Sequence, residues 1–283
     1  RRTSFGGAFR RDLPAPAGRA TVAAMSDLQI LAITRFAYPG LGGFQTEHDT
    51  VEARQAYLWH PDRMETRFRT LEHVCLRTLA AQTDGDFRTI VMTGDALPEP
   101  WRSRLVSLVS GLKGGHVVFH PAEQYREAIR NVVLPFIDPD GPPTMQFRHD
   151  DDDGVGRRFV ARSRETFADV RPFWERHKRL TIDFNQGYLL GLTPDGPRTE
   201  ATFNPHLGVA QAVFLAPTNT RTALHFPHHR IGTLMPSITL PDAPMWLRGV
   251  DGMNDSGVRA QVERLIPADE ERRAELRRRF ALD

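Results

Sequence analysis

The sequence predicts an α/β protein in which a mostly parallel mixed sheet is flanked by helices, with a C-terminal extension. Strand-like and helix-like stretches alternate from residue 28 to residue 147, as in parallel sheets covered on both faces. The first strand, 28–36, is almost continuously apolar, which is typical of a strand buried on both faces. The chain has 283 residues, of which 40% are hydrophobic, enough for a sizeable core.

The first elements follow from apolar periodicity. A helix over 63–82 follows the first strand, because its apolar residues recur on one face while Arg67 falls on another. A turn at Thr83-Asp84-Gly85-Asp86 separates this helix from a second buried strand at 87–93. A second amphipathic helix is predicted over 101–112 and ends at two glycines.

The third and fourth strands complete the alternating pattern. A short strand at 116–119 precedes Pro121, which suits the first turn of a helix that runs to about residue 136. A fourth strand, 145–147, leads directly into four consecutive aspartates, Asp150 to Asp153. Because ligands of such sheets bind beyond the carboxyl ends of the strands, the acidic residues lie where chemistry is expected.

The C-terminal half is less regular. We expect a helix over 157–178 with a break at Pro172, and a strand at 180–184 that pairs with 187–192 through Asn185-Gln186. Residues 193–260 are rich in proline, with strands at 209–215 and 238–240. An Arg- and Glu-rich helix is expected over 267–282.

Residues 1–24 differ in composition from the rest. They are rich in Arg, Gly, Ala and Pro and lack an apolar period, so we expect a disordered leader, with Met25 as the natural start and a transit peptide as the alternative. The predicted organisation is this leader, a main domain over 25–260, and a C-terminal amphipathic helix over 261–283.

Charge and cysteine content limit the classes of function. The net charge of +2 does not favour a nucleic-acid protein, although the basic residues are almost all arginine, which suits phosphate binding. No apolar run reaches the roughly 20 residues of a transmembrane helix. Cys75 is the single cysteine and is expected to be buried, so we expect a cytoplasmic protein without disulfides.

The stretch from Met145 to Gly154 carries the strongest chemical signal. On extended backbone, side chains alternate between faces, so Asp150 and Asp152 can point the same way and bind a hard cation such as Mn²⁺ or Mg²⁺. An EF-hand is excluded, because the register with Gly154 puts His149 and Val160 at ligand positions. A solvated acidic turn, or a helix N-terminus that favours carboxylates, is the alternative.

These residues resemble the DXD element of GT-A glycosyltransferases, which have a Rossmann-like fold. A second stretch, Thr78 to Met92, resembles the Gln-Thr helix end and following strand of family-2-type enzymes. Further stretches, among them Ile182 to Gly187 and Met245 to Arg248, resemble a bacterial group of rhamnosyltransferases. The resemblance covers about residues 27–255 and implies transfer of a sugar, with rhamnose as one option, from a nucleotide-sugar donor.

The resemblance also implies where the donor binds. Its first and third aspartates, Asp150 and Asp152, hold the metal and the donor diphosphate. Thr34 and Arg35 close the first strand, where nucleotide contacts are expected. In place of the family's base-binding Asp-Asp this chain has Thr93-Gly94-Asp95, so the base contact is shifted to Asp95 or absent. The candidate donor-binding residues are Thr34, Arg35, Asp95, Arg148 and Asp151.

Histidines and further aspartates are candidates for the remaining roles. Some GT-A enzymes supply a histidine to the metal from a C-terminal segment, and His228 is preferred here over His225 and His229. An inverting enzyme needs a general base. Asp183 and Asp153 are the candidate catalytic residues, with His206 and Asp251 as alternatives to Asp183.

Two other classes of function remain open. A nucleotidyltransferase or metal phosphohydrolase could use the same aspartates, although the sequence has no G-x-x-x-x-G-K-[ST] phosphate loop. A non-catalytic glycan-binding or assembly protein could keep the fold. The expected acceptor is a carbohydrate or surface polysaccharide. Arginines of the terminal helix could touch a membrane surface or a partner, although interleaved glutamates favour a solvated face.

Overall fold

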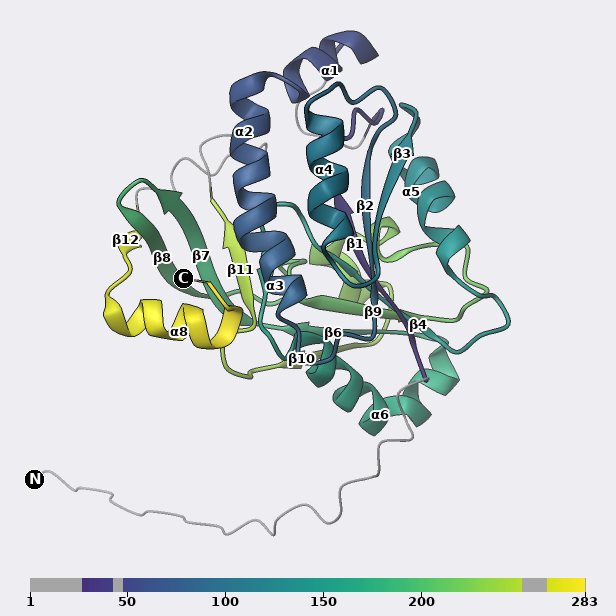
Figure 1. The fold of residues 1–283 in the computed structure, drawn as a ribbon. Coiled ribbons are helices and arrows are strands. Elements are labelled where there is room, and N and C mark those ends of the chain that lie inside the picture. Colours follow the sequence, from purple (N-terminus) through teal and green to yellow (C-terminus); the bar gives the residue numbers. More distant parts are fainter. Residues whose placement is uncertain (1–26, 43–47, 251–263, 283) are drawn as a thin grey trace, which may run out of the picture.

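A computed structural model describes residues 27–42, 48–250 and 264–282 (Figure 1). The expected leader at 1–24, the proposed start at Met25 and the candidate Asp251 lie outside the described residues. None of the helices within the described ranges has the length and apolar character needed to cross a lipid bilayer.

A seven-stranded mixed sheet forms the centre of the fold. Its order is β10-β6-β9-β4-β1-β2-β3, and β1 lies parallel to both of its neighbours, β2 and β4. Only β9 runs antiparallel to its neighbours β4 and β6, so the predicted mostly parallel sheet is confirmed. The strands are β1 (Gln29–Arg35), β2 (Arg88–Gly94), β3 (Gly115–His120), β4 (Thr144–Arg148), β6 (Arg179–Phe184), β9 (Gln211–Leu215) and β10 (Ser237–Leu240).

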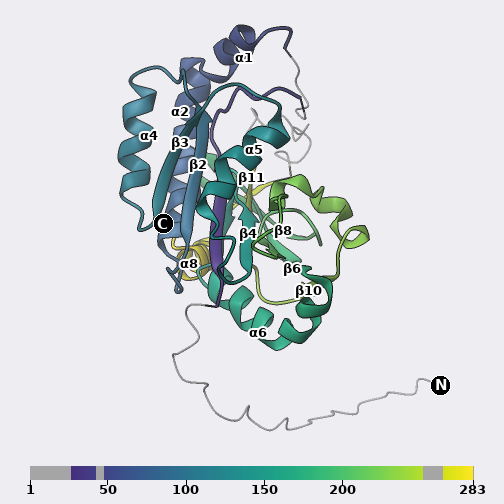
Figure 2. The same cartoon turned by 90° about the vertical axis from the view of Figure 1, so that its right-hand side faces the viewer.

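Helices cover both faces of this sheet, because alternate strand residues point to opposite sides. Ile30 and Ala32 face α2, α4 and α6, whereas Leu31 and Ile33 face α5 on the other side (Figure 2). The helices of the described residues up to position 177 are α1 (Val51–Leu58), α2 (Pro61–Thr70), a π-helical turn η1 (Leu71–Leu76), α3 (Arg77–Ala80), α4 (Trp101–Ser110), α5 (Tyr125–Val133), η2 (Leu134–Phe136) and α6 (Phe159–His177).

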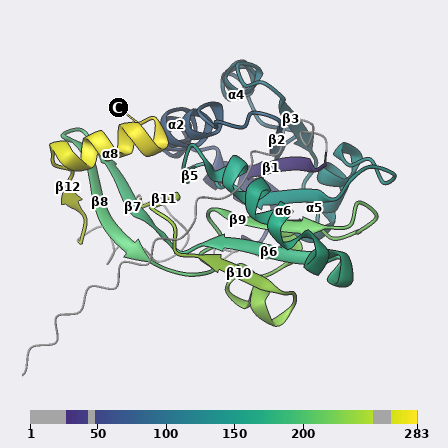
Figure 3. The same cartoon turned by 90° about the horizontal axis from the view of Figure 1, so that it is seen from below.

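A second, five-stranded sheet stands beside the first and is covered by the C-terminal helix (Figure 3). Its order is β12-β8-β7-β11-β5. Leu276 and Phe280 of α8 (Glu270–Phe280) pack on this sheet, so the terminal helix is docked and only its other face is solvated. The strands are β5 (Gly154–Val155), β7 (Gln186–Thr193), β8 (Gly196–Phe203), β11 (Trp246–Gly249) and β12 (Ile266–Pro267).

The predicted pairing of 180–184 with 187–192 is wrong. β6 pairs with β9 and β10 in the large sheet, whereas β7 pairs with β8 and β11 in the second sheet. Gly187 makes the switch possible, because a Cβ at this position would overlap the backbone and indole of Trp246. Buried Trp246 in turn donates its indole N–H to the carbonyl of Phe184 at 3.0 Å, which ties the two sheets together.

Three helix predictions need correction. α5 begins at Tyr125 and not at Pro121, whose carbonyl instead accepts the hydroxyl hydrogen of Tyr38 at 2.6 Å. α6 continues through Pro172, since this residue lies in an exposed part of the helix and the turn survives the loss of one N–H. α8 starts at Glu270, later than expected, because the Asp269 side chain caps it by accepting from the backbone N–H of Arg272 at 2.8 Å.

Candidate active site

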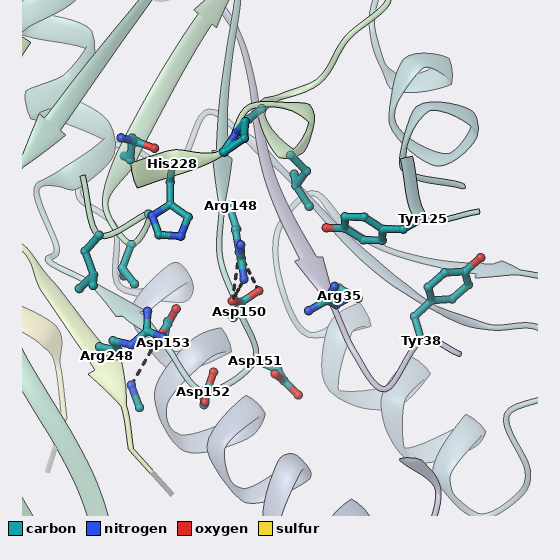
Figure 4. A pocket seen from close by; sticks show the side chains of 18 of the residues that line it. Arg35, Tyr38, Tyr125, Arg148, Asp150, Asp151, Asp152, Asp153, His228 and Arg248 are labelled. Carbon is teal, nitrogen blue, oxygen red and sulfur yellow. Dashed lines mark hydrogen bonds and ion pairs between the residues drawn. The ribbon is translucent and has the colours of Figure 1, made fainter. Parts of the chain in front are cut away.

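A cavity of about 460 Å³ opens at the carboxyl ends of β1 and β4 (Figure 4). The acidic turn after β4 lies on one side, and Tyr38, Tyr125 and His228 stand around it. Guanidinium groups match the geometry of phosphate oxygens, so this lining suits an anionic ligand. The arginines that line the cavity are Arg35, Arg54, Arg63, Arg67, Arg126, Arg148 and Arg248.

The acidic residues form a turn and not an extended strand. The backbone N–H of Asp153 donates to the carbonyl of Asp150 at 3.1 Å, so the expected alternation of side chains does not apply. The four carboxylates instead spread around the turn (Figure 4). Asp150 and Asp152 nevertheless line the same cavity.

Asp150 is held by its neighbour in the chain. The Nε atom of Arg148 donates to both carboxylate oxygens, at 3.1 and 3.0 Å, and Nη2 forms a further contact with Oδ2. Burial alone would raise the pKa of Asp150, but the charges of Arg148, Arg35 and Arg67 outweigh it and lower the pKa. Asp150 is therefore an anion at neutral pH.

Asp151 points away from the others into a buried contact with α2. Arg67 donates from Nε to Oδ2 at 2.7 Å and from Nη2 to Oδ1, so both carboxylate oxygens are engaged. Asp151 is fully buried, and its burial, with the charges of Asp152 and Asp150, raises its pKa to about 7 against the opposing effect of Arg67. This contact fixes the acidic turn on α2.

Asp152 and Asp153 face β11 of the second sheet. The backbone N–H of Gly249 donates to Oδ1 of Asp153 at 3.2 Å. A Cβ on Gly249 would come within 2.6 Å of the Cβ of Asp152, so only glycine allows this approach. Burial and the charges of Asp152 and Asp150 raise the pKa of Asp153, and the nearby charge of Arg248 acts in the opposite direction.

His228 is the histidine that the structure brings to the acidic turn. It lies in the 3₁₀-helix η4 (His228–Thr233), and its ring points toward the turn (Figure 4). Nδ1 lies 2.7 Å from the carbonyl of His206, to which it donates. Burial lowers the pKa of His228, as do the charges of Arg148 and Arg248, so its neutral ring keeps a lone pair on Nε2.

Asp183 is connected to His228 through the backbone of His206. Its Oδ2 accepts the backbone N–H of His206 at 2.9 Å, and the carbonyl of His206 is the partner of His228. His206 has a φ of 58°, a left-handed conformation that costs energy for a residue with a Cβ. Asp183 is fully buried, is not among the residues that line the described cavity, and has a pKa raised by burial. Its geometry is that of a positioning residue.

The other two histidines have different surroundings. His225 lies at the end of η3 (Ala223–His225), where its Nδ1 accepts from the backbone N–H of Thr222 at 3.1 Å and closes a capping box. His229 is exposed and packs edge-on against His228. His225 lines the cavity, whereas His229 is not among its lining residues.

Arg35 lies at the opposite end of the cavity from the second sheet. Its guanidinium group is 5.2 Å from the ring centre of Tyr125, and Tyr38 stands beside them (Figure 4). Burial raises the pKa of Tyr38 to about 12, so its hydroxyl stays protonated. Flat rings next to a guanidinium group can pack against a planar ligand.

Two predicted donor-binding residues are not among those lining the described cavity. Thr34 is fully buried. Asp95 is exposed, and its backbone, not its side chain, is engaged: the N–H donates to His120 and the carbonyl accepts from Arg102. Arg35, Arg148 and Asp151 do line the cavity.

The sequence analysis missed several residues of the candidate site, among them Tyr38, Tyr125, Arg67, Arg248 and Gly249. Arg67 was assigned to a face away from the core, because the pattern of a helix does not reveal what lies beside its polar face. Arg248 and Gly249 come from β11, a strand that was not predicted. The one sequence signal for β11 was the stretch from Met245 to Arg248, which resembles the rhamnosyltransferase group but was not assigned to a strand or to the site.

The comparisons with known proteins identify the family. The fold and site define an α/β protein with a cationic and acidic cavity at the strand ends, as in nucleotide-binding sheets. Residues 29–263 match the model of the family described as "Putative rhamnosyl transferase", and the chain belongs to this family. No curated protein matches the chain.

Solved structures are similar at low identity. Staphylococcus aureus TarS 1–349 in complex with UDP is 11% identical with a TM-score of 0.41, and covers 79% of this chain and 61% of its own. A putative nucleotide-diphospho-sugar transferase from Desulfovibrio desulfuricans G20 is 10% identical with a TM-score of 0.40, and covers 90% of this chain and 92% of its own. The match therefore spans about three fifths of the TarS 1–349 chain.

Proposed function

We propose that this chain transfers a sugar from a nucleotide-sugar donor to a carbohydrate acceptor. One observation carries the proposal: the chain of a rhamnosyltransferase family places an acidic turn and seven arginines around a single cavity at the strand ends. A nucleoside diphosphate offers two phosphates for the arginines and a planar base for the end with Tyr38 and Tyr125. The family name supports rhamnose as the sugar. A surface polysaccharide is part of the proposal as the acceptor.

A divalent cation, Mn²⁺ or Mg²⁺, belongs to this proposal. Within residues 27–42, 48–250 and 264–282, no three acidic, histidine or cysteine side chains already converge as a metal centre. The donor set still fits, because Asp150 and Asp152 supply oxygens to the cavity and His228 supplies the lone pair of Nε2. When bound, such a cation would offset the charge of the departing diphosphate.

Asp153 is our candidate for the general base. It lines the cavity, whereas Asp183 lies behind His206, so Asp153 is the one of the two that an acceptor hydroxyl can reach. The Gly249 N–H fixes one carboxylate oxygen of Asp153. A raised pKa makes the deprotonated carboxylate a stronger base, and the rate should then rise with pH through this pKa.

A cytoplasmic location is part of the proposal. The buried thiol of Cys75, the single cysteine, is consistent with a reducing compartment. The surface arginines of α8 pair mostly with glutamates of the same helix, for example Arg279 with Glu275 at 2.9 Å, which supports a solvated outer face.

A thermal-shift screen tests the proposal. UDP, GDP, TDP and CDP are each added with Mn²⁺, Mg²⁺ or EDTA, and a ligand at a hundred times its Kd stabilises the fold by about 2.7 kcal/mol. The expected result is a shift with one nucleotide that is lost with EDTA, followed by release of that nucleotide from its rhamnose conjugate. No shift with any nucleotide would contradict a donor site and favour a non-catalytic module.

A further inference from the structure

The wall of the cavity that faces the acidic turn carries only positive charge. Residues 201–241 contain no Asp or Glu, but they contain Arg221, Arg230 and four histidines. This stretch supplies β9, η3 and η4, and residues 223–228 of it line the cavity continuously. An anion that enters the cavity along this wall meets no carboxylate from it.

Helix α5 adds two arginines to the same wall. Arg126 lines the cavity, and Arg130 follows four residues later on the same face of the helix. Arg130 is anchored to this wall, because its Nε donates to the carbonyl of Thr220 at 3.3 Å. The charges of Arg126, Arg130 and Arg221 all act on the ring of His225, so the three guanidinium groups lie near one cavity-lining residue.

His225, near these arginines, is held in place by Thr222 and is uncharged. Its Nδ1 accepts hydrogen bonds from Thr222, and burial, together with the three arginines, lowers its pKa. The side chains of Arg126 and Arg221 are exposed and form no ion pair with any other residue of the described ranges. Their donors are therefore available to a ligand.

The cluster differs from the arginines near the acidic turn. Arg67 forms an ion pair with Asp151, and Arg148 forms one with Asp150. Arg148 and Arg248 lie near His228, on the side where the donor diphosphate is proposed to bind. Arg126 lines the cavity, and Arg221 acts on the cavity-lining His225 without lining the cavity itself. A second cationic region therefore borders the cavity, apart from the one that the donor needs.

We infer that the cluster of Arg126, Arg130 and Arg221 binds an anionic group of the acceptor, so that the acceptor is a charged saccharide and not a neutral one. This inference rests on the proposed sugar transfer and specifies its second substrate. Phosphate and carboxylate groups share the required chemistry, because both accept paired hydrogen bonds from guanidinium groups.

Binding of defined oligosaccharides tests the inference without turnover. Isothermal titration of the full chain uses three probes of equal length: an oligomer of glycerol phosphate, an oligogalacturonate and neutral maltooligosaccharide. The variants are Arg126→Gln combined with Arg221→Gln, both exposed, and the control Arg176→Gln, an exposed arginine on α6.

The expected result is binding of at least one anionic probe, no binding of the neutral probe, and a Kd that rises about tenfold in the double variant but not in R176Q. The probe that binds more tightly distinguishes phosphate from carboxylate. Equal binding of the neutral probe, no binding of either anionic probe, or an unchanged Kd in the double variant would overturn the inference. The nucleotide screen is independent of this titration, so a failure of the donor site would be seen separately.

Discussion

Replacing Arg67 by methionine removes the partner of a fully buried carboxylate. Arg67 engages both oxygens of Asp151 and also approaches Asp152, with Nη1 3.4 Å from Oδ2. The Arg67 side chain is only 16% exposed and that of Asp151 is fully buried, so water cannot replace the lost contact. Removal of one partner of a buried ion pair costs about 3–5 kcal/mol when the remaining charge stays buried.

The pH dependence of this cost follows from the pKa of Asp151. Its pKa of about 7 in the folded protein is above the unfolded value of about 3.9, so the wild-type protein loses stability as pH rises between these two values. The variant lacks the guanidinium group that lowers the pKa of Asp151, so this pKa is higher than in the wild type. The variant therefore continues to lose stability as the pH rises above 7. The difference between the proteins should therefore be small near pH 5, where both carboxyls are protonated, and grow by about 1.4 kcal/mol per pH unit above 7.

Urea unfolding at several pH values measures this difference. The control is Arg69→Met, an exposed arginine on the same helix that should change the free energy of unfolding by less than about 0.5 kcal/mol. The expected result for R67M is a loss of roughly 4 kcal/mol at pH 9 and about 1 kcal/mol at pH 5. A loss that is the same at both pH values would refute the reasoning.

Substitutions at three further positions test other parts of the site. Asp183→Ala should release the loop that holds His228, weaken metal-dependent nucleotide binding by about tenfold and shift the His228 pKa in NMR titrations. Asp183→Asn keeps an acceptor oxygen and should retain the wild-type affinity and the wild-type pKa of His228. The same affinity and the same His228 pKa in the two variants would contradict the positioning role. Gly249→Ala should lower stability by about 1–3 kcal/mol in thermal melts, because its Cβ would lie 2.6 Å from that of Asp152; an unchanged Tm would be the contrary result. Asp153→Asn should lower kcat by at least about a hundredfold and abolish the rise of the rate with pH, with nucleotide Kd unchanged; retained kcat would exclude Asp153 as the base.

The parallel core was predictable because its strands are buried on both faces. The apolar runs that form β1 and β2 have to be buried on both faces, which a parallel sheet covered by helices provides. The helices between these strands then fix the topology. The second sheet was not predictable on these grounds. β8 is half-exposed and lacks an apolar run, and the switch of the chain between sheets depends on contact of Gly187 with Trp246, which are distant in sequence.

The site was predicted in part for a similar reason. The acidic turn, Arg148 and His228 were found because residue type and position after a strand carry a local signal. The partners of these residues come from elements far away in sequence, as with Arg67 on α2 and Gly249 on β11. Helix and strand patterns describe each element alone and do not specify which side chains meet across them.

The most direct test of the proposed donor site is calorimetric binding of the nucleotide selected by the screen, with Mn²⁺, to three proteins. Wild type and Asp195→Asn, which alters an exposed residue in the β7–β8 turn, should bind it with the same Kd. Asp152→Ala should lose the Mn²⁺-dependent binding while its fold remains intact, because it removes one of the crowded carboxylates. Unchanged Mn²⁺-dependent affinity in D152A would contradict the assignment of the acidic turn as the cation and diphosphate site.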